Sequence, residues 1–171
     1  MVRAAVEAGP RLIAIVLPGI PESVRIARLH VRTALGFHRL ADYIEDAEIV
    51  TSELVTNAVH HVRGDGTETI GVTLARAWNP PAVTVVVSDS SPDGPCRCDP
   101  SADSEQGRGL QIVAALSAHW GWHPQDGGKA VFAVIARGDM TCHGGQLGPA
   151  AQCGSAGSSG VGFSGPVSSA R

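Results

Sequence analysis

The stretch SELVTNAVHH, residues 52–61, carries the most information about the fold of this chain. Its Glu53, Asn57 and either His60 or His61 recur at helical spacing, so one stripe of a helix carries a carboxylate, an amide and an imidazole. The apolar residues of the segment form an opposed stripe that is expected to face a core. Taken alone, this spacing favours the ordinary solvated face of an amphipathic helix over a functional stripe.

The helix around this stretch is predicted to begin with Asp42 as its N-cap and to run to about Val62. Another helix precedes it, opening at Pro21 and ending at Gly36. A strand over residues 11–17 comes first and ends at a Pro-Gly pair. The first part of the chain is therefore expected to be one strand followed by two helices.

After the two helices the pattern changes to short apolar strands. A hairpin of two strands, a long loop, a short helix and two more strands are predicted over residues 69–77, 82–88, 90–106, 109–117, 119–123 and 129–137. Trp120 and Trp122, two apart on a strand, are expected to point to one face and to pack in the core or line the sheet. The order of elements predicts an α/β two-layer sandwich, a mixed and mostly antiparallel sheet covered on one face by helices.

Length and composition favour one folded domain. The chain has 171 residues, 43% of them hydrophobic, which is enough for one core. We expect an N-terminal extension over residues 1–10, the domain over 11–137 and a flexible Gly/Ser-rich tail over 138–171. Because the net charge is -3 and no basic cluster occurs, direct binding to nucleic acid is disfavoured. No apolar run is long enough for a membrane span or a signal peptide, so we expect a cytoplasmic protein without membrane contact.

The cysteines are sparse and fall in segments that are expected to be loop or tail. A zinc site could be drawn among them, but the spacing fits no common structural finger, and reduced, unligated thiols are the preferred interpretation. The four are Cys96, Cys98, Cys142 and Cys153.

Two further segments contain residues that could bind a ligand. Asp89 follows the apolar run 83–87 and could either accept hydrogen bonds from a ligand's amino group or cap the next turn. Gly107 and Gly109 flank Arg108 where a helix begins, so backbone N–H groups there could approach a phosphate. A G-x-G alone is weak, and no Walker or dinucleotide-binding pattern is present.

Six pieces of sequence, in this order, resemble one known family. They are LPGIPESVRIAR, ELVTNAVHH, VVVSDSSP, GRGLQIVAAL, HWGW and GGKAVFAVI. Together they resemble the GHKL superfamily of ATPases and kinases with the Bergerat fold, most closely the small actinomycete proteins related to anti-sigma-factor serine kinases. The resemblance extends over residues 11–136 and implies a pocket for Mg-ATP.

The resemblance implies a role for each matched residue. Glu53 would be the general base, Asn57 would ligate Mg²⁺, and Asp89 would accept from the adenine amino group. The lid that holds the phosphates would be formed by Gly107, Arg108, Gly109 and Leu110. His61, Ser91 and Ala130 would also contact the nucleotide.

Two positions depart from the family pattern. Asp89-Ser90-Ser91-Pro92 stands where the family often has a glycine box, and Ala130 stands where a threonine near the adenine is common. Both departures imply weaker nucleotide binding, while Glu53 and Asn57 keep the catalytic pair intact.

The function implied is that of a serine kinase that uses ATP and Mg²⁺. It would phosphorylate an anti-anti-sigma antagonist of the STAS type and, in another state, bind and silence a sigma factor, with the helix over residues 21–35 as the element for homodimer or partner contact. One alternative is a module that binds ATP and a partner without transfer; another is a degenerate pocket that binds no nucleotide. A two-component histidine kinase is disfavoured because the chain has no dimerisation and phosphoacceptor helix pair.

Overall fold

The computed structural model describes residues 10–62, 67–95 and 108–137. In these ranges the chain alternates between helices that cover a sheet and strands that build it. The elements are β1 (Arg11–Pro18), α2 (Glu22–Phe37), the 3-10 helix η1 (Ala41–Tyr43), α3 (Ile44–His61), β2 (Thr69–Trp78), β3 (Pro81–Asp89), α4 (Arg108–Leu116), β4 (His119–Gln125) and β5 (Gly128–Ala136).

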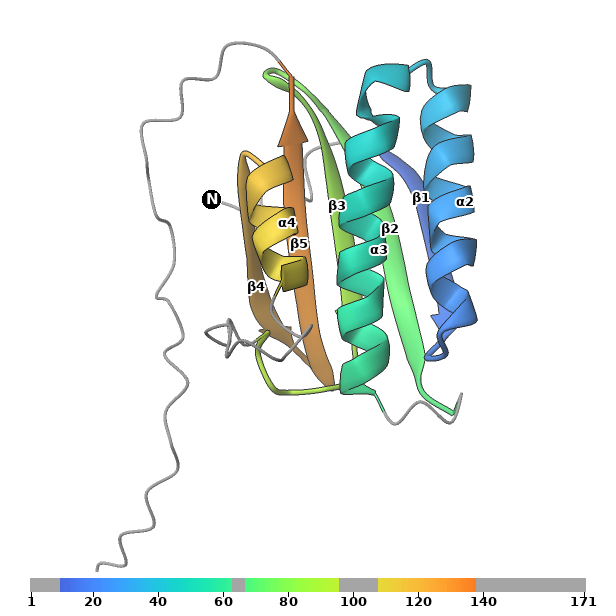
Figure 1. Cartoon of the computed structure of the whole chain (residues 1–171), viewed down its shortest axis with the longest axis vertical. Coiled ribbons are helices and arrows are strands. Elements are labelled where there is room, and N and C mark those ends of the chain that lie inside the picture. Colours follow the sequence, from blue (N-terminus) through green and yellow to red (C-terminus); the bar gives the residue numbers. More distant parts are fainter. Residues whose placement is uncertain (1–9, 63–66, 96–107, 138–171) are drawn as a thin grey trace, which may run out of the picture.

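The strands form one sheet in the order β1-β2-β3-β5-β4. Figure 1 shows α2, α3 and α4 on the same face of this sheet, with α3 between the other two. The predicted two-layer sandwich is therefore confirmed. The sheet was expected to be mixed, but every strand pair in the described part of the chain is antiparallel. The reason lies in the connections, because β2 and β3, and likewise β4 and β5, are consecutive hairpin partners.

The main core lies between the helices and the sheet. The odd-numbered residues Val83, Val85 and Val87 of β3 are almost fully buried there, as are Val50 and Leu54 of α3. Burial of each such side chain stabilises the fold by about 1.5–3 kcal/mol. Trp120 and Trp122 are partly buried and pack against this core, as predicted. No helix in the described ranges is both long enough and apolar enough to cross a membrane.

The end of α2 differs from the prediction. Gly36 lies inside the helix, which continues to Phe37. The chain leaves the helix through Arg39, whose φ of 56° is left-handed, and the N–H of Leu40 donates to the carbonyl of Leu35. A left-handed residue followed by such a bond is a common helix ending, and here an arginine takes a position that usually holds glycine.

The start of α3 also differs. Asp42 lies in the 3-10 helix, and the N-cap of α3 is Tyr43, which makes no side-chain capping bond. The backbone carbonyl of Asp42 accepts instead from the guanidinium of Arg137, at 2.6 Å from Nη2 and 3.1 Å from Nε. Asp42 is therefore not the predicted cap, because a tight turn precedes the helix and ties it to the chain after β5.

An ion pair joins α2 to α3. Arg32 donates to both carboxylate oxygens of Glu48, from Nε at 2.9 Å and from Nη2 at 2.6 Å. Glu48 is buried, and the hydrogen bonds from Arg32 hold the pKa of its carboxyl below the ordinary value despite that burial. The two hydrogen bonds link α2 to α3, and a different face of α3 lines the pocket described below.

Candidate nucleotide-binding site

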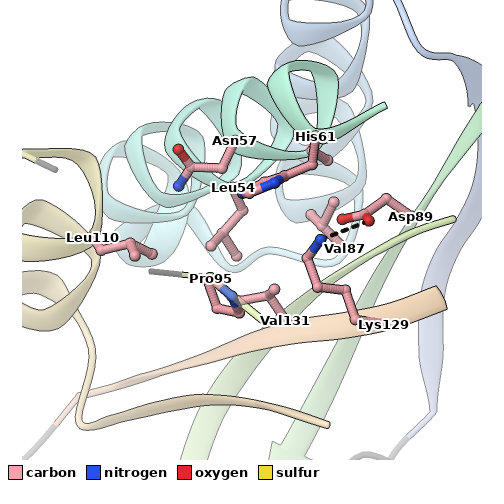
Figure 2. A pocket seen from close by; sticks show the side chains of 10 residues that line it. Leu54, Asn57, His61, Val87, Asp89, Pro95, Leu110, Lys129 and Val131 are labelled. Atoms are coloured by element: carbon pink, nitrogen blue, oxygen red, sulfur yellow. Dashed lines mark hydrogen bonds and ion pairs between the residues drawn. The ribbon is translucent and has the colours of Figure 1, made fainter. Parts of the chain in front are cut away.

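A pocket opens where α3 passes over the ends of β3 and β5, beside the first turn of α4 (Figure 2). Its volume is about 260 Å³, counted out to open solvent. The residues that line it are Leu54, Asn57, Ala58, His61, Val87, Asp89, Pro95, Leu110, Lys129 and Val131. Apolar side chains form the walls, and the four polar ones are Asn57, His61, Asp89 and Lys129, which is the usual composition of a small-molecule site.

The contribution of α3 is a stripe that borders the core. Leu54, Asn57, Ala58 and His61 recur at helical spacing and all line the pocket. The stripe was expected to lie opposite the apolar face, but Leu54 and Ala58 belong to the core themselves. Asn57 lies one turn after Leu54 and directly before Ala58. It is therefore half-buried at the border of the core, whereas His61, at the end of the helix, is exposed.

Asn57 has an unsatisfied amide. Its Nδ2 atom is buried and has no hydrogen-bond partner in the described part of the chain. An unpaired buried donor of this kind costs about 1–3 kcal/mol. A ligand in the pocket would remove that cost.

The residues fit a magnesium nucleotide. The carbonyl oxygen of the Asn57 amide is a hard donor, and Mg²⁺ is commonly held by one or two protein oxygens, several waters and the substrate phosphates. The described residues contain no group of three or more His, Cys, Asp or Glu that could hold a metal by themselves.

His61, and not His60, belongs to the pocket. Both side chains are exposed to solvent, but only His61 also lines the pocket (Figure 2). Burial lowers the pKa of the His61 imidazole, and the positive charge of Lys129 lowers it further, while Asp89 and Asp93 oppose the shift. The neutral imidazole is therefore the favoured form near neutral pH.

Glu53 lies beside the pocket and does not line it. Its carboxylate lies against the start of α4, where a Cβ added at Gly109 would be 2.5 Å from Oε2. Only a residue without a side chain leaves this space open, so the glycine permits the close approach of α4 and Glu53. The predicted base and the predicted lid residue are therefore neighbours.

Asp89 is the last residue of β3, lines the pocket and is paired with Lys129. The Nζ of Lys129 donates to Oδ1 at 2.8 Å, and both side chains are almost completely buried. Oδ1 also accepts from the backbone N–H of Ser91 at 2.9 Å. Asp89 thus caps the next turn, which was one of the two interpretations from the sequence. It also lines the pocket, where the other interpretation, contact with a ligand's amino group, remains a prediction.

The sequence prediction missed Lys129. It is the direct cross-strand partner of Asp89, and a Cβ at the preceding Gly128 would collide with the carbonyl of Asp89. The available signal was a lone lysine at the start of an otherwise apolar strand, because a buried cation needs a counter-charge.

The prediction for Ala130 placed it on the wrong face. Ala130 pairs with Ser88 and is buried with Val86 and Phe132 in a second cluster, separate from the main core. Side chains alternate along a strand, so a shift of one residue changes the face. The position on β5 that faces the pocket belongs to Lys129.

The remaining predicted residues are distributed as follows. Leu110 lines the pocket, and Arg108 is exposed at the first residue of α4. Ser91 does not line the pocket, and its Oγ accepts from the N–H of Asp93 at 3.3 Å within the turn. Gly107 and the four cysteines lie outside the described residues.

Comparison with known proteins agrees with this geometry. The sequence profile of the histidine kinase-like ATPase domain matches residues 17–135, and the chain belongs to this family. The family is one of ATPases, which implies ATP as the ligand of the domain. No curated protein sequence matches the chain.

Solved structures of similar fold include the crystal structure of the RsbU and RsbW domains of Rv1364c from Mycobacterium tuberculosis, with a TM-score of 0.51 and 22% sequence identity. The match covers 74% of this chain and 32% of that one, so this chain spans about a third of the length of the similar protein.

Proposed function

We propose that this protein binds Mg-ATP and transfers the γ-phosphate to a serine of an anti-anti-sigma antagonist of the STAS type. Membership of an ATPase family supports the nucleotide. The observation that carries the proposal is the buried Nδ2 of Asn57, which has no hydrogen-bond partner in the described part of the chain, in a mostly apolar pocket that Asp89 also lines.

Polar groups of the pocket would bind different parts of the nucleotide. Asp89 would accept from the amino group of the adenine, between apolar walls that exclude water from the base. Asn57 would provide the protein ligand to Mg²⁺, which neutralises charge on the phosphates when it is bound. The N-terminal turn of α4, with Arg108 and Gly109, would lie beside the phosphates.

Glu53 is the proposed general base. It would accept the proton of the serine hydroxyl while the new bond to the γ-phosphorus forms and the bond to ADP breaks. Its carboxylate lies outside the pocket, one helical turn from Asn57, on the side where α4 begins. This position suits a group that acts on the acceptor and not on the nucleotide.

The partners follow from the family resemblance. We propose a sigma factor as the second partner and a homodimer as the assembly, in the cytoplasm. The helix α2 supports contact with another chain, because Leu29 and Phe37 on it are 58% and 83% exposed. Large exposed apolar side chains are common at protein interfaces.

Transfer of radiolabel from ATP to candidate STAS antagonists tests the proposed activity. We expect Glu53→Gln to bind ATP as the wild type does and to lose about 10²–10⁴-fold in transfer rate. Glu45→Gln, an exposed glutamate on the same helix, is the matched control and should transfer normally. Unchanged transfer by Glu53→Gln would show that another group is the base.

A second function is favoured by the segment after β3, where Ser91 and Pro92 follow Asp89 in place of the family's glycine box. The chain would then bind ATP to shape a surface for its partner, without transfer. Tight ATP binding by the wild type, combined with no transfer to any antagonist that it binds, would support this function over the kinase.

A further inference from the structure

Lys129 is a buried cation that lines the pocket, and the proposed function assigns it no role. Its side chain is 1% exposed, and its ion pair is with Asp89. An ammonium group has three protons. One is donated to Asp89 at 2.8 Å, and the contact to the carbonyl of Ser91, at 3.5 Å, is longer than a normal hydrogen bond.

At least one proton of Lys129 therefore has no acceptor in the described part of the chain. The partner carboxylate is also incompletely used, because Oδ1 of Asp89 receives both of its hydrogen bonds. The pair thus offers one donor and one acceptor side by side, and both residues line the pocket (Figure 2). Buried charged groups normally complete their hydrogen bonds, so a ligand with a matching edge is expected here.

Adenine has such an edge. Its 6-amino group donates, and the neighbouring ring nitrogen N1 accepts. We infer that Lys129 is a base-reading residue that donates to N1 of adenine while Asp89 accepts from the 6-amino group. The inference rests on the proposed ATP binding and adds a specificity-determining residue to it.

The ion pair also selects against guanine. Guanine presents a carbonyl oxygen where adenine has the amino group, and an N–H where adenine has N1. The carbonyl would face the Asp89 carboxylate and the N–H would face the Lys129 ammonium, so both contacts would be repulsive. Two mismatches in a buried site reject a ligand more strongly than one.

Calorimetric titration with 1-deaza-ATP tests the inference, because this analogue keeps the 6-amino group and lacks the N1 acceptor. A hydrogen bond to a charged group is worth enough that we expect wild type to bind it about 10- to 100-fold more weakly than ATP. The matched control is 7-deaza-ATP, which loses a ring nitrogen on the other edge and should bind as ATP does.

Lys129→Met should bind ATP and 1-deaza-ATP equally. Because that variant leaves Asp89 buried and unpaired, Asp89→Asn/Lys129→Met provides a neutral pair with the same expected lack of discrimination. Equal binding of the two nucleotides by wild type would overturn the role of Lys129 and leave the proposed function standing. If either folded variant still bound ATP more tightly than 1-deaza-ATP, the role of Lys129 would be overturned as well. If wild type did not bind ATP, both this inference and the proposed function would be overturned.

Discussion

Gly109 of α4 and Glu53 of α3 lie against each other, so that a Cβ on the glycine would be 2.5 Å from Oε2 of the glutamate. The contact joins the residue proposed as the base to the helix proposed to lie beside the phosphates. The end of the Glu53 side chain is flexible and can move away from an added methyl group. The glycine therefore affects the position of the Glu53 carboxylate more than the stability of the fold.

Gly109→Ala should therefore lower activity and leave the fold stable. A displaced base is expected to reduce phosphotransfer by roughly 10- to 100-fold, since small errors of position are costly in catalysis. The free energy of unfolding, measured with urea, should stay within about 1 kcal/mol of the wild type. Gly36→Ala is the control, because a Cβ there meets nothing within 4 Å and should leave transfer unchanged. Full activity of Gly109→Ala would contradict the proposed position of the base.

The lowered pKa of His61 makes stability depend on pH. Burial is the main cause of the shift from the ordinary value of 6.5, so the unfolded chain takes up a proton at this site before the folded chain does. The stability that the neutral His61 contributes is present above that ordinary value and is lost as pH falls below it, toward the folded pKa. His61→Gln should lose less stability than wild type between about pH 7.5 and about pH 5.5.

Urea unfolding at several pH values measures this effect. His60→Gln is the matched control, because His60 is the neighbouring histidine on the same helix and does not line the pocket. It should follow the wild-type curve. A curve for His61→Gln that is parallel to wild type would show that the imidazole is not held neutral by its surroundings.

The pair between Arg32 and Glu48 should make the free energy of unfolding depend on pH in the acidic range. Hydrogen bonds from Arg32 lower the pKa of Glu48, so the folded chain keeps this carboxylate ionised to lower pH than the unfolded chain does. Its contribution is present above the ordinary value of 4.5 and is lost as pH falls through the folded pKa. Glu48→Gln should be less stable than wild type at neutral pH, with a difference that shrinks toward about pH 3. Chemical unfolding would disprove this if the difference stayed constant or if exposed Glu45→Gln behaved in the same way.

The layers of the fold could be predicted from the sequence because each element has its own period. The apolar residues of α3 recur every three to four positions, and the valines of β3 form a continuous run bounded by prolines and Asp89. The turns were harder to predict. Asp42 is of a type that often caps a helix, but its backbone is held by Arg137, which is distant in sequence. Gly36 is of a type that often ends a helix, but the chain leaves α2 at Arg39, whose left-handed φ is unusual for an arginine.

The part of the candidate site that lies on a single helix could be predicted from the sequence. Asn57 and His61 reach the pocket because both lie on one stripe of α3. The pairing of Asp89 with Lys129 depends on the register of β3 with β5, which no local pattern specifies. A shift of one residue exchanged Lys129 for Ala130 in the prediction, and with it the face of the sheet.

Asn57→Ala should abolish the part of ATP binding that depends on Mg²⁺. The Nδ2 of Asn57 is buried without a partner in the described part of the chain, and the proposal assigns the oxygen of the same amide to the metal. Thr56→Ala, one position earlier on α3 and not in the pocket, is the control and should bind as wild type.

Calorimetric titration of ATP into wild type, with and without Mg²⁺, and into both variants at matched salt tests the central claim most directly. We expect binding by wild type that strengthens with Mg²⁺, the same response in Thr56→Ala, and no response to Mg²⁺ in Asn57→Ala. Binding by Asn57→Ala that strengthens with Mg²⁺ as in wild type, or no binding of ATP by wild type at millimolar concentration, would contradict the claim that this pocket holds Mg-ATP.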